Sequence, residues 1–331
     1  MPKRNKDKDQ YIKFIAVIDI IMKYSDEKHH MTINDIKEKL YELDNDFQID
    51  FRAIKKYVTF YNEYYEDNII ESYKKGRKLY FYFVNRSLDM IEAKAILDLV
   101  YSSDFFTLQT KKNYRKRVQD MFSLHYQGYF HKKLDLHIVK NENPQVFYQE
   151  LEVITRAIQK KKKIRFCYQK PSLKQQNSGK ITELAPIDTV FSNNEYYLLC
   201  QGARNSNDCI QYRLDYIKNV EIIEDSSVYF SPTELASFHE KLKNMTYMYG
   251  EGSIEIIELE FKDYVYANII DKFGKNIKPY KINDDTYKIQ IKHLINNTFY
   301  SWLIGFGGAI KISGNENQVQ KFKDFLTKNF I

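Results

Sequence analysis

Cysteine is scarce in this sequence. The 331 residues contain 3 cysteines, Cys167, Cys200 and Cys209, and no two of them form a CxxC pair. A small, odd number of scattered cysteines excludes a disulfide framework and argues against a zinc site. We therefore expect reduced thiols and a cytoplasmic location.

Long apolar runs and a secretory signal are also missing. No stretch approaches about 18 consecutive apolar residues, so we expect no membrane span and no membrane partner. The basic residues at 1–10 are followed by neither an apolar core nor a small-residue cleavage site, which is unlike a secretory signal. The 43% hydrophobic and 29% charged residues are typical of a folded protein, and the length suits two or three domains.

Catalytic motifs are missing as well. The 7 histidines show no HExxH spacing, and there is no Gly-x-Ser-x-Gly turn. The run GFGG at 305–308 follows an expected helix instead of leading from a strand into one, so it does not form a phosphate-binding loop. We predict that the protein is not an enzyme and has no catalytic residue, no metal ligand and no cofactor.

Positive charge is present, and it is local. Lys and Arg total 51 against 44 Asp and Glu, which gives a net charge of +7. Residues 1–85 are almost balanced, yet the range 72–86 contains cations and no acid. These cations are Lys74, Lys75, Arg77, Lys78 and Arg86. A local cluster of this kind is what binding to phosphates requires.

The start of the chain predicts a helix-turn-helix. Apolar spacing indicates helices at 10–24, after Thr32 and after Asp50, and Thr32 with Asp35 forms a capping-box pattern. The third helix carries polar side chains opposite its apolar stripe, namely Arg52, Lys55, Lys56 and Thr59. A short helix of this kind after another short helix is typical of a module that places its second helix in the major groove. An ordinary solvated basic face would give the same pattern.

A basic hairpin follows these helices. Residues 69–84 alternate between apolar and polar side chains and turn at Lys75–Gly76, which predicts a β-hairpin. Its tip carries only cations, namely Lys74, Lys75, Arg77 and Lys78. Helices followed by a basic hairpin form a winged helix-turn-helix, which we place at 1–86. The hairpin would contact backbone phosphates while the third helix contacts base edges.

A helical linker and a small barrel are predicted for the middle of the chain. Residues 88–126 have helical periodicity and no Gly or Pro, and we assign 87–143 to the linker. A helix and five short strands then indicate a small barrel at 144–226. The strands are expected at 163–169, 183–191, 195–201, 209–215 and 219–223, with Asn193 and Asn194 in a tight turn.

Several motifs here resemble the WYL domain of bacterial transcriptional regulators. They are KKIRFCY, LAPIDTVFSNNEYYLLCQ and QYRLDYIKNVEII. The matching positions are Tyr196, Tyr197 and Leu198 for the family's Trp-Tyr-Leu, Pro186 for its proline, and Tyr212 to Ile217 for its FRLDRI-like strand. The run IDFRAIKKYV is similar to the family's recognition helix, and FYSWLIGFGGAIKISG is similar to the extension that follows the WYL domain. This chain departs from the family where Tyr196 replaces Trp and Tyr216 replaces Arg.

The expected barrel carries candidate effector-binding residues, namely Tyr168, Tyr196, Tyr197, Arg204 and Arg213. Tyr197 and Arg213 lie on adjacent expected strands with Arg204 in the loop between them. An Arg beside an aromatic ring suits a phosphate next to a base. The resemblance likewise implies a nucleotide or a short nucleic acid as the effector. The alternative is that Tyr197 belongs to the core and that Arg213 is paired with Glu195 or Asp215.

The end of the chain predicts a further domain. Residues 226–252 are expected to form a linker with a short helix, and residues 253–331 follow a β-α-β-β-α-β order, which is ferredoxin-like. The range 226–331 has 13 basic and 12 acidic residues, so we do not expect it to contact DNA. Its expected roles are dimerisation and contact with the neighbouring barrel.

These features together predict an α+β multidomain protein. It would combine a winged helix-turn-helix, an Sm-like barrel of the WYL type and a ferredoxin-like domain. We expect a homodimeric, sequence-specific DNA-binding transcriptional regulator, a repressor, which binds an inverted repeat in double-stranded DNA under the control of the effector. The alternatives are an accessory protein that binds RNA or single strands, and a protein-interaction scaffold.

Overall fold

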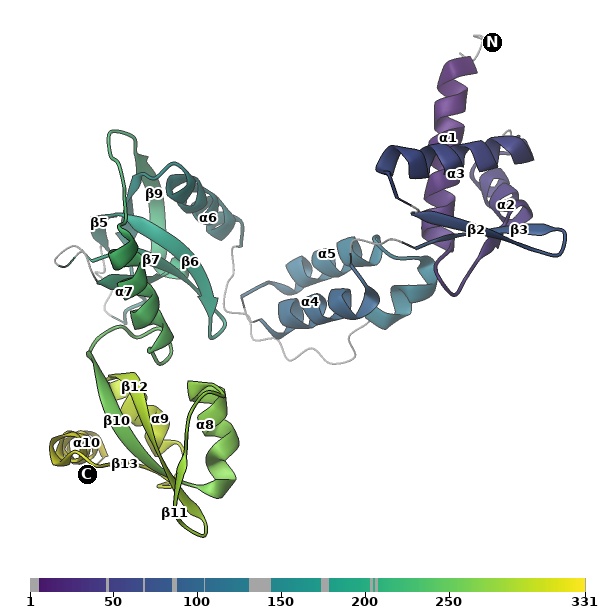
Figure 1. The fold of residues 1–331 in the computed structure, drawn as a ribbon. Helices are drawn as coiled ribbons and strands as arrows, with labels where there is room; N and C mark the ends of the chain where they lie inside the picture. Colours follow the sequence, from purple (N-terminus) through teal and green to yellow (C-terminus); the bar gives the residue numbers. More distant parts are fainter. Residues whose placement is uncertain are drawn as a thin grey trace. The chain divides into compact units, whose positions relative to one another are not determined.

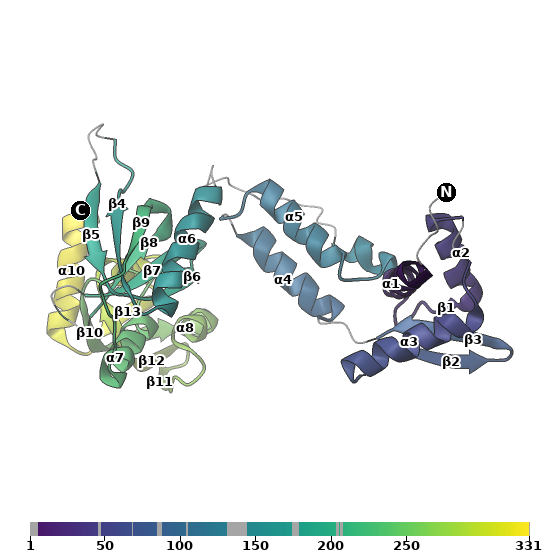
Figure 2. The ribbon, with the colours of Figure 1, turned by 90° about the horizontal axis from the view of Figure 1, so that it is seen from above.

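The computed structural model divides into two compact units, Met1–Glu142 and Asn143–Ile331, which we describe separately (Figures 1 and 2). The structure describes residues 6–45, 48–67, 69–84, 88–103, 105–130, 144–173, 179–202, 205 and 208–330. Both units combine helices with small sheets, so the expected mixed α+β class is confirmed. In the described ranges, no helix has the length and apolar character that crossing a bilayer requires.

The first unit begins with three helices and a hairpin. The elements are α1 (Lys6–Tyr24), β1 (Met31–Thr32), α2 (Ile33–Leu43), α3 (Phe51–Tyr65), β2 (Ile70–Lys75) and β3 (Lys78–Phe83). The short strand β1 pairs with β3, which gives a sheet of order β1-β3-β2. One apolar core holds these elements together and includes Ile21, Leu40, Ile54 and Phe81, all buried. The helices and the hairpin expected here are therefore present.

Local features of the chain mark the start of α2 and the end of α3. The Thr32 hydroxyl accepts a hydrogen bond from the Asp35 N–H at 3.3 Å, and the Asp35 carboxylate accepts one from the Thr32 N–H at 2.7 Å. This is the capping box that the sequence predicts before α2. Asp50 precedes α3 as expected but makes no side-chain cap, and α3 ends at Glu66 with a left-handed backbone, φ 53°.

The linker region of the first unit is helical but interrupted. It contains α4 (Met90–Ser102), α5 (Leu108–Gln119) and the 3₁₀ helix η1 (Leu124–Phe130). Thr107 caps α5 by accepting a hydrogen bond from the Thr110 N–H at 3.2 Å. A small core of Ala93, Leu97, Phe122 and Phe130 packs these elements together.

The second unit begins with a helix and six strands. They are α6 (Pro144–Gln159), β4 (Lys163–Tyr168), β5 (Lys180–Leu184), β6 (Pro186–Ser192), β7 (Glu195–Gln201), β8 (Cys209–Arg213) and β9 (Ile217–Ile223). Asn193 and Asn194 connect β6 to β7 with φ values of 51° and 63°. Two consecutive positive φ values match the tight hairpin turn that the sequence predicts there.

The expected closed barrel is not formed by the strands that the structure describes. They form two three-stranded sheets instead, of orders β5-β4-β9 and β6-β7-β8. The strand expected at 183–191 is two strands, because Pro186 has no N–H to donate and the register shifts between Pro186 and Asp188. A 3₁₀ turn at Leu214–Tyr216 likewise separates β8 from β9. The chain therefore passes from one sheet to the other at these two corners without a continuous ladder.

The rest of the second unit contains a helix and a four-stranded sheet with its own helices. The elements are α7 (Pro232–Lys243), β10 (Ser253–Lys262), α8 (Tyr266–Phe273), β11 (Tyr280–Asn283), β12 (Thr286–Ile295), α9 (Asn297–Ile304), β13 (Ile310–Ser313) and α10 (Glu316–Phe330). The sheet is antiparallel with the order β11-β12-β10-β13. The strands and helices therefore alternate in the β-α-β-β-α-β sequence order.

Helix α7 is longer than the short helix expected in the linker. Its start is a complete capping box: Glu234 N–H donates to the Ser231 hydroxyl at 3.2 Å, and Ser231 N–H donates to the Glu234 carboxylate at 2.8 Å. Pro232 occupies the first turn, where its missing N–H costs nothing. The signal was thus present in the run SPTE.

Candidate nucleic-acid interface and ligand cleft

Helix α3 presents its predicted polar residues on one exposed face. Arg52, Lys55, Lys56 and Thr59 are all exposed. The opposite face buries Ile54, Tyr57 and Val58 in the core of the unit. Within the described residues, no carboxylate is in ion-pair contact with these three cations. Their charge is therefore available to a partner outside the unit.

The hairpin places its cations close together at its tip. Lys74, Lys75, Arg77 and Lys78 are exposed, and none of them has an ion-pair partner in the described part of the chain. Lys75 lies directly opposite Lys78 in the β2–β3 register. Gly76 opens the turn with φ +62°, a conformation that side chains rarely adopt. Like charges opposite one another destabilise a strand pair unless an anion lies between them.

Asn62 joins α3 to the hairpin. Its side-chain amide donates to the Ile70 carbonyl at 2.8 Å and accepts from the Ile70 N–H at 3.0 Å. The two bonds connect the last turn of α3 to the first residue of β2. Helix and hairpin thus keep a fixed spacing, which a joint contact with a rigid partner requires. No local sequence pattern marks Asn62, because only the fold brings it to the strand.

Aromatic side chains stiffen the hairpin behind its tip. Tyr73 stacks on Tyr80 with ring centroids 5.2 Å apart, and His30 stacks on Tyr82 at 4.2 Å. His30 Nδ1 also lies 2.9 Å from the Tyr73 hydroxyl, and the Tyr82 hydroxyl donates to Glu71. Cross-strand aromatic pairs of this kind stabilise two-stranded sheets, which are otherwise marginal.

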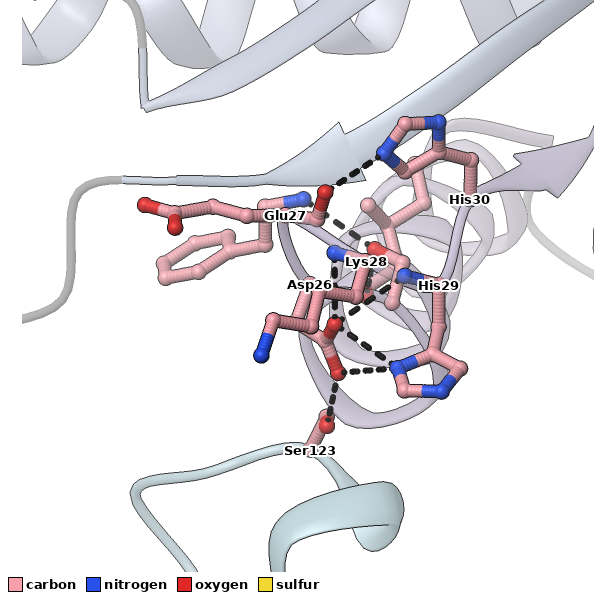
Figure 3. A network of polar contacts seen from close by, with 9 residues as sticks. Asp26, Glu27, Lys28, His29, His30 and Ser123 are labelled. Atoms are coloured by element: carbon pink, nitrogen blue, oxygen red, sulfur yellow. Dashed lines mark hydrogen bonds and ion pairs between the residues drawn. The ribbon is translucent and has the colours of Figure 1, made fainter. Parts of the chain in front are cut away.

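A buried carboxylate connects the helix-and-hairpin module to the linker helices (Figure 3). Asp26 accepts hydrogen bonds from the Lys28 and His29 N–H groups at 2.9 and 3.0 Å and from His29 Nδ1 at 2.8 Å. Ser123, just before η1, donates to the same carboxylate at 2.5 Å. The His29 ring stacks on His125 at 3.9 Å. Burial raises the pKa of Asp26, but these hydrogen bonds outweigh it and hold the pKa below its ordinary value.

We call the contact of Asp26 with Ser123 the joint at Asp26. We predict that Ser123→Ala lowers the free energy needed to open this joint. The substitution leaves a buried carboxylate with one donor fewer, which costs about 1.5–3 kcal/mol of local opening free energy. Native-state hydrogen exchange of residues 21–30 in the full chain measures it. The cost shrinks as the pH falls through the depressed pKa of Asp26, since a protonated carboxyl needs fewer donors. Ser102→Ala, which removes an exposed hydroxyl at the end of α4, is the matched control, and equal exchange in both variants would contradict the assignment.

The second unit contains an open cleft of about 1080 Å³, which we call the tyrosine cleft. Three of the predicted effector residues line it, namely Tyr168, Tyr197 and Arg213. Tyr197 lies directly opposite Arg213 in the β7–β8 register, and the Arg213 N–H donates to the Tyr168 hydroxyl at 3.3 Å. Burial raises the pKa of Tyr168 to about 12. The far wall includes Met248, Tyr249 and Ile254.

The other two predicted effector residues are not part of this described lining. Tyr196 packs against Phe147 of α6 and Phe191 of β6, with ring centroids 5.4 and 4.9 Å apart. Consecutive strand residues point to opposite faces, so Tyr196 cannot share a face with Tyr197. Arg204 lies outside the described residues.

Arg213 is neutralised inside the protein. Its guanidinium forms ion pairs with Glu195 at 2.8 Å and Asp215 at 2.6 Å, and it lies over the Tyr216 ring at 4.5 Å. Burial lowers the pKa of Arg213, but the hydrogen bond and charge of Asp215 and the charge of Glu195 raise it above its ordinary value. The structure thus contains both ion pairs that the sequence left open as the alternative to a ligand contact.

The remaining charges of the tyrosine cleft are also balanced. Lys170 and Lys241 face it together with Asp208, Glu240 and Glu251, and Lys241 is in contact with Asp208. The cleft combines three half-buried tyrosine rings and the exposed ring of Tyr249 with paired charges. This chemistry suits a flat, weakly charged ring better than several phosphates.

The three cysteines of the second unit form no disulfide among the described residues. Burial raises the pKa of Cys209 to about 11 and that of Cys200 above its ordinary value. Protonated thiols are poor nucleophiles and poor metal ligands. Among the described residues, no group of three or more His, Cys, Asp and Glu side chains is placed to hold a metal ion.

A double-mutant cycle tests the neutralisation of Arg213. We expect Arg213→Gln and Asp215→Asn to destabilise the second unit singly, and to show a coupling of about 1 kcal/mol when combined. Urea unfolding followed by the emission of Trp302, in the same unit, provides the free energies. The exposed pair Arg156–Glu152 on α6, also at 2.6 Å, is the matched control and should couple more weakly. Zero coupling between Arg213 and Asp215 would contradict this ion pair and leave Glu195 as the only carboxylate that neutralises the guanidinium among the described residues.

Comparison with known proteins identifies one domain. Residues 149–222 match the family model described as the WYL domain, so this part of the second unit is a WYL domain. No curated protein matches the chain. Among solved structures, the chain is similar to the proteasome accessory factor B/C (PafBC) of Arthrobacter aurescens, with 13% identity and a TM-score of 0.30. That match covers 98% of this chain and 49% of the other, so this chain spans about half its length.

A second solved structure, described as a CRISPR Cas-related protein, is also similar. It has 12% identity and a TM-score of 0.36, and the match covers 97% of this chain and 84% of the other.

Proposed function

We propose that this WYL-domain protein is a sequence-specific DNA-binding transcriptional regulator. The observation that carries the proposal is the set of exposed cations on α3 and on the adjacent hairpin, none with an acidic partner among the described residues. In the proposed layout, residues 1–86 form a winged helix-turn-helix, 87–143 a helical linker, 144–226 the WYL domain and 253–331 a ferredoxin-like domain. The protein acts as a cytoplasmic homodimer and has no enzymatic activity.

The shape of the first unit supports a duplex as the partner. The major groove admits one α-helix, and α3 has a buried face and a cationic face as such a helix needs. Arg52, Lys55, Lys56 and Thr59 would face base edges, while Lys74, Lys75, Arg77 and Lys78 would contact phosphates. Phosphates would also relieve the repulsion between Lys75 and Lys78.

The tyrosine cleft supports control by a ligand. The rings of Tyr197 and Tyr249, which line the cleft, would stack on a base-like group. Arg213 could bind a phosphate only by exchanging Glu195 or Asp215 for it. We therefore propose a nucleotide-like effector recognised mainly through its base. Its binding changes operator affinity, and the operator changes effector affinity by the same factor.

Selection of duplexes from a random pool by the full chain tests the function. A homodimeric regulator enriches an inverted repeat whose half-sites lie about one helical turn, or a multiple of it, apart. Preferential recovery of single strands supports the alternative of an accessory protein that binds RNA or single strands. Recovery of no nucleic acid at low salt supports the scaffold alternative.

The hairpin has a distinct signature in salt titrations. We expect Lys75→Gln with Arg77→Gln to weaken binding to all duplexes alike and to reduce the slope of log K against log salt by about 2. Fluorescence anisotropy with an operator and with a random duplex measures both. Lys323→Gln with Lys328→Gln, two exposed lysines of α10, is the charge-matched control. An unchanged slope in the hairpin variant would remove the hairpin from the interface.

Helix α3 has a different signature. We expect Arg52→Ala to lower the ratio of operator affinity to random-duplex affinity by about tenfold or more, because a base contact is lost. The hairpin variant should leave that ratio unchanged. Competition binding at constant salt separates the two effects. An equal loss on both duplexes would show that Arg52 contacts phosphate and not a base.

A further inference from the structure

A second large cleft lies in the C-terminal part of the second unit, and it shares only Glu240 with the described lining of the tyrosine cleft. Its volume is about 1080 Å³, and we call it the lysine cleft. It is formed by the end of α7, by α8 with the loop that follows it, and by β12. Besides Tyr280, the titratable residues that line it are His239, Glu240, Lys243, Lys272, Lys278, Lys292 and His293. Only one of them is an acid.

The net charge of this part of the sequence does not reveal the positive charge of the cleft. Residues 226–331 are almost neutral, with 13 basic and 12 acidic side chains. Glu240 forms an ion pair with Lys292. The charges of the other lysines of the cleft are therefore not neutralised by Glu240. Lys243 and Lys278 are exposed, and no acid of the described residues pairs with either. The tyrosine cleft has no comparable excess of cations.

Lys272 is the innermost cation of the lysine cleft. Its Nζ lies 5.5 Å from the centre of the Tyr247 ring and 5.8 Å from that of Trp302. Burial lowers the pKa of Lys272 to about 8, and no carboxylate opposes this effect. An ammonium group taken from water without a counter-charge is costly, and a bound anion offsets that cost.

Neutral polar groups surround these cations. His293 is buried, and burial together with the charge of Lys272 lowers its pKa to about 4, so its imidazole is neutral. Its Nε2 lies 2.9 Å from the Thr246 hydroxyl. Asn276 and Gln290 line the same cleft and can donate hydrogen bonds, while Tyr280 offers a half-exposed ring at one side.

We propose that the lysine cleft binds a small anion carrying two or more phosphate groups. Lysines from three separate elements converge there, so a ligand must present several negative charges at a distance from one another. Lysine is a common phosphate ligand that acts as a point charge, and side-chain amides complete such sites. The volume exceeds that of a single phosphate and is close to the upper limit of small-molecule sites. Inorganic pyrophosphate and nucleoside polyphosphates share this chemistry.

Trp302 reports binding directly, because it is the only tryptophan of the chain and its ring contacts Lys272. The full chain is titrated with inorganic pyrophosphate, with a nucleoside triphosphate and with a nucleoside monophosphate, all without divalent cations. Tryptophan emission is followed, and equilibrium dialysis provides an independent dissociation constant. We expect saturable binding of pyrophosphate and of the triphosphate, at least tenfold tighter than that of the monophosphate.

Two variants and a control assign the binding to this cleft. Lys272→Met keeps the packing of the aliphatic stem, and Lys278→Gln changes an exposed side chain that the fold does not need. Each should raise the dissociation constant of pyrophosphate about tenfold or more, since an ion pair to the phosphates is lost. Lys311→Gln, an exposed cation on β13, should leave it unchanged. Urea unfolding followed by Trp302 emission checks that each variant is folded.

The same titration distinguishes a ligand recognised through its nucleoside from one recognised through its phosphate groups alone. A triphosphate that binds more tightly than pyrophosphate shows that the nucleoside is also recognised, and Tyr280→Leu should then remove the difference. Equal affinities show that the phosphate groups alone are recognised. Absence of binding by dialysis at millimolar pyrophosphate overturns the proposal. Binding that Lys278→Gln and Lys272→Met leave unchanged overturns it as well.

Discussion

Uncompensated like charge is the constraint on which the first unit depends. The hairpin holds Lys75 opposite Lys78, and α3 exposes Arg52, Lys55 and Lys56, with no acid among the described residues to pair with any of them. Such an arrangement costs free energy in the isolated protein, and the core beneath it provides the compensation. The pair of hydrogen bonds from Asn62 to Ile70 keeps the two groups of cations at a fixed spacing. A rigid polyanion is the partner that recovers the cost at both places at once.

The second unit distributes its charges in the opposite way. In the tyrosine cleft the conspicuous cation, Arg213, is bound by Glu195 and Asp215, whereas the lysine cleft leaves most of its cations without an acid. Helix α7 separates the two clefts, and its residue Glu240 lines both. Glu240 pairs with Lys292. An anion that drew Lys292 into the lysine cleft would leave the charge of Glu240 exposed to the tyrosine cleft. Glu240 is thus a side chain that the two clefts share.

Local signals were predictable from the sequence, and register and sheet closure were not. The Thr32–Asp35 capping box, the turn at Gly76 and the turn at Asn193–Asn194 each depend on adjacent residues, and all three are present. The run SPTE at the start of α7 is an equally local signal, because it encodes the capping box and the proline of the first turn. The expected barrel failed at Pro186, where one strand became two, because closure depends on how two sheets meet. The contacts of Asn62 and Tyr196 and the charge of the lysine cleft depend on residues that only the fold brings together.

The joint at Asp26 determines how motion of the linker reaches the proposed DNA-binding surface. Ser25, next to Asp26, accepts a hydrogen bond from the Phe83 N–H at the end of the hairpin and donates one to Ile21 of α1. Asp26 itself binds Ser123 beside η1. Two consecutive buried residues, Ser25 and Asp26, thus connect α1, the hairpin and the linker. In a buried polar network each broken hydrogen bond costs free energy, which favours the one geometry that satisfies all the bonds. A displacement of η1 must therefore carry the hairpin with it, or break the bond to Asp26. Asn62 fixes the spacing between α3 and the hairpin, and Ser25 and Asp26 connect the hairpin to η1.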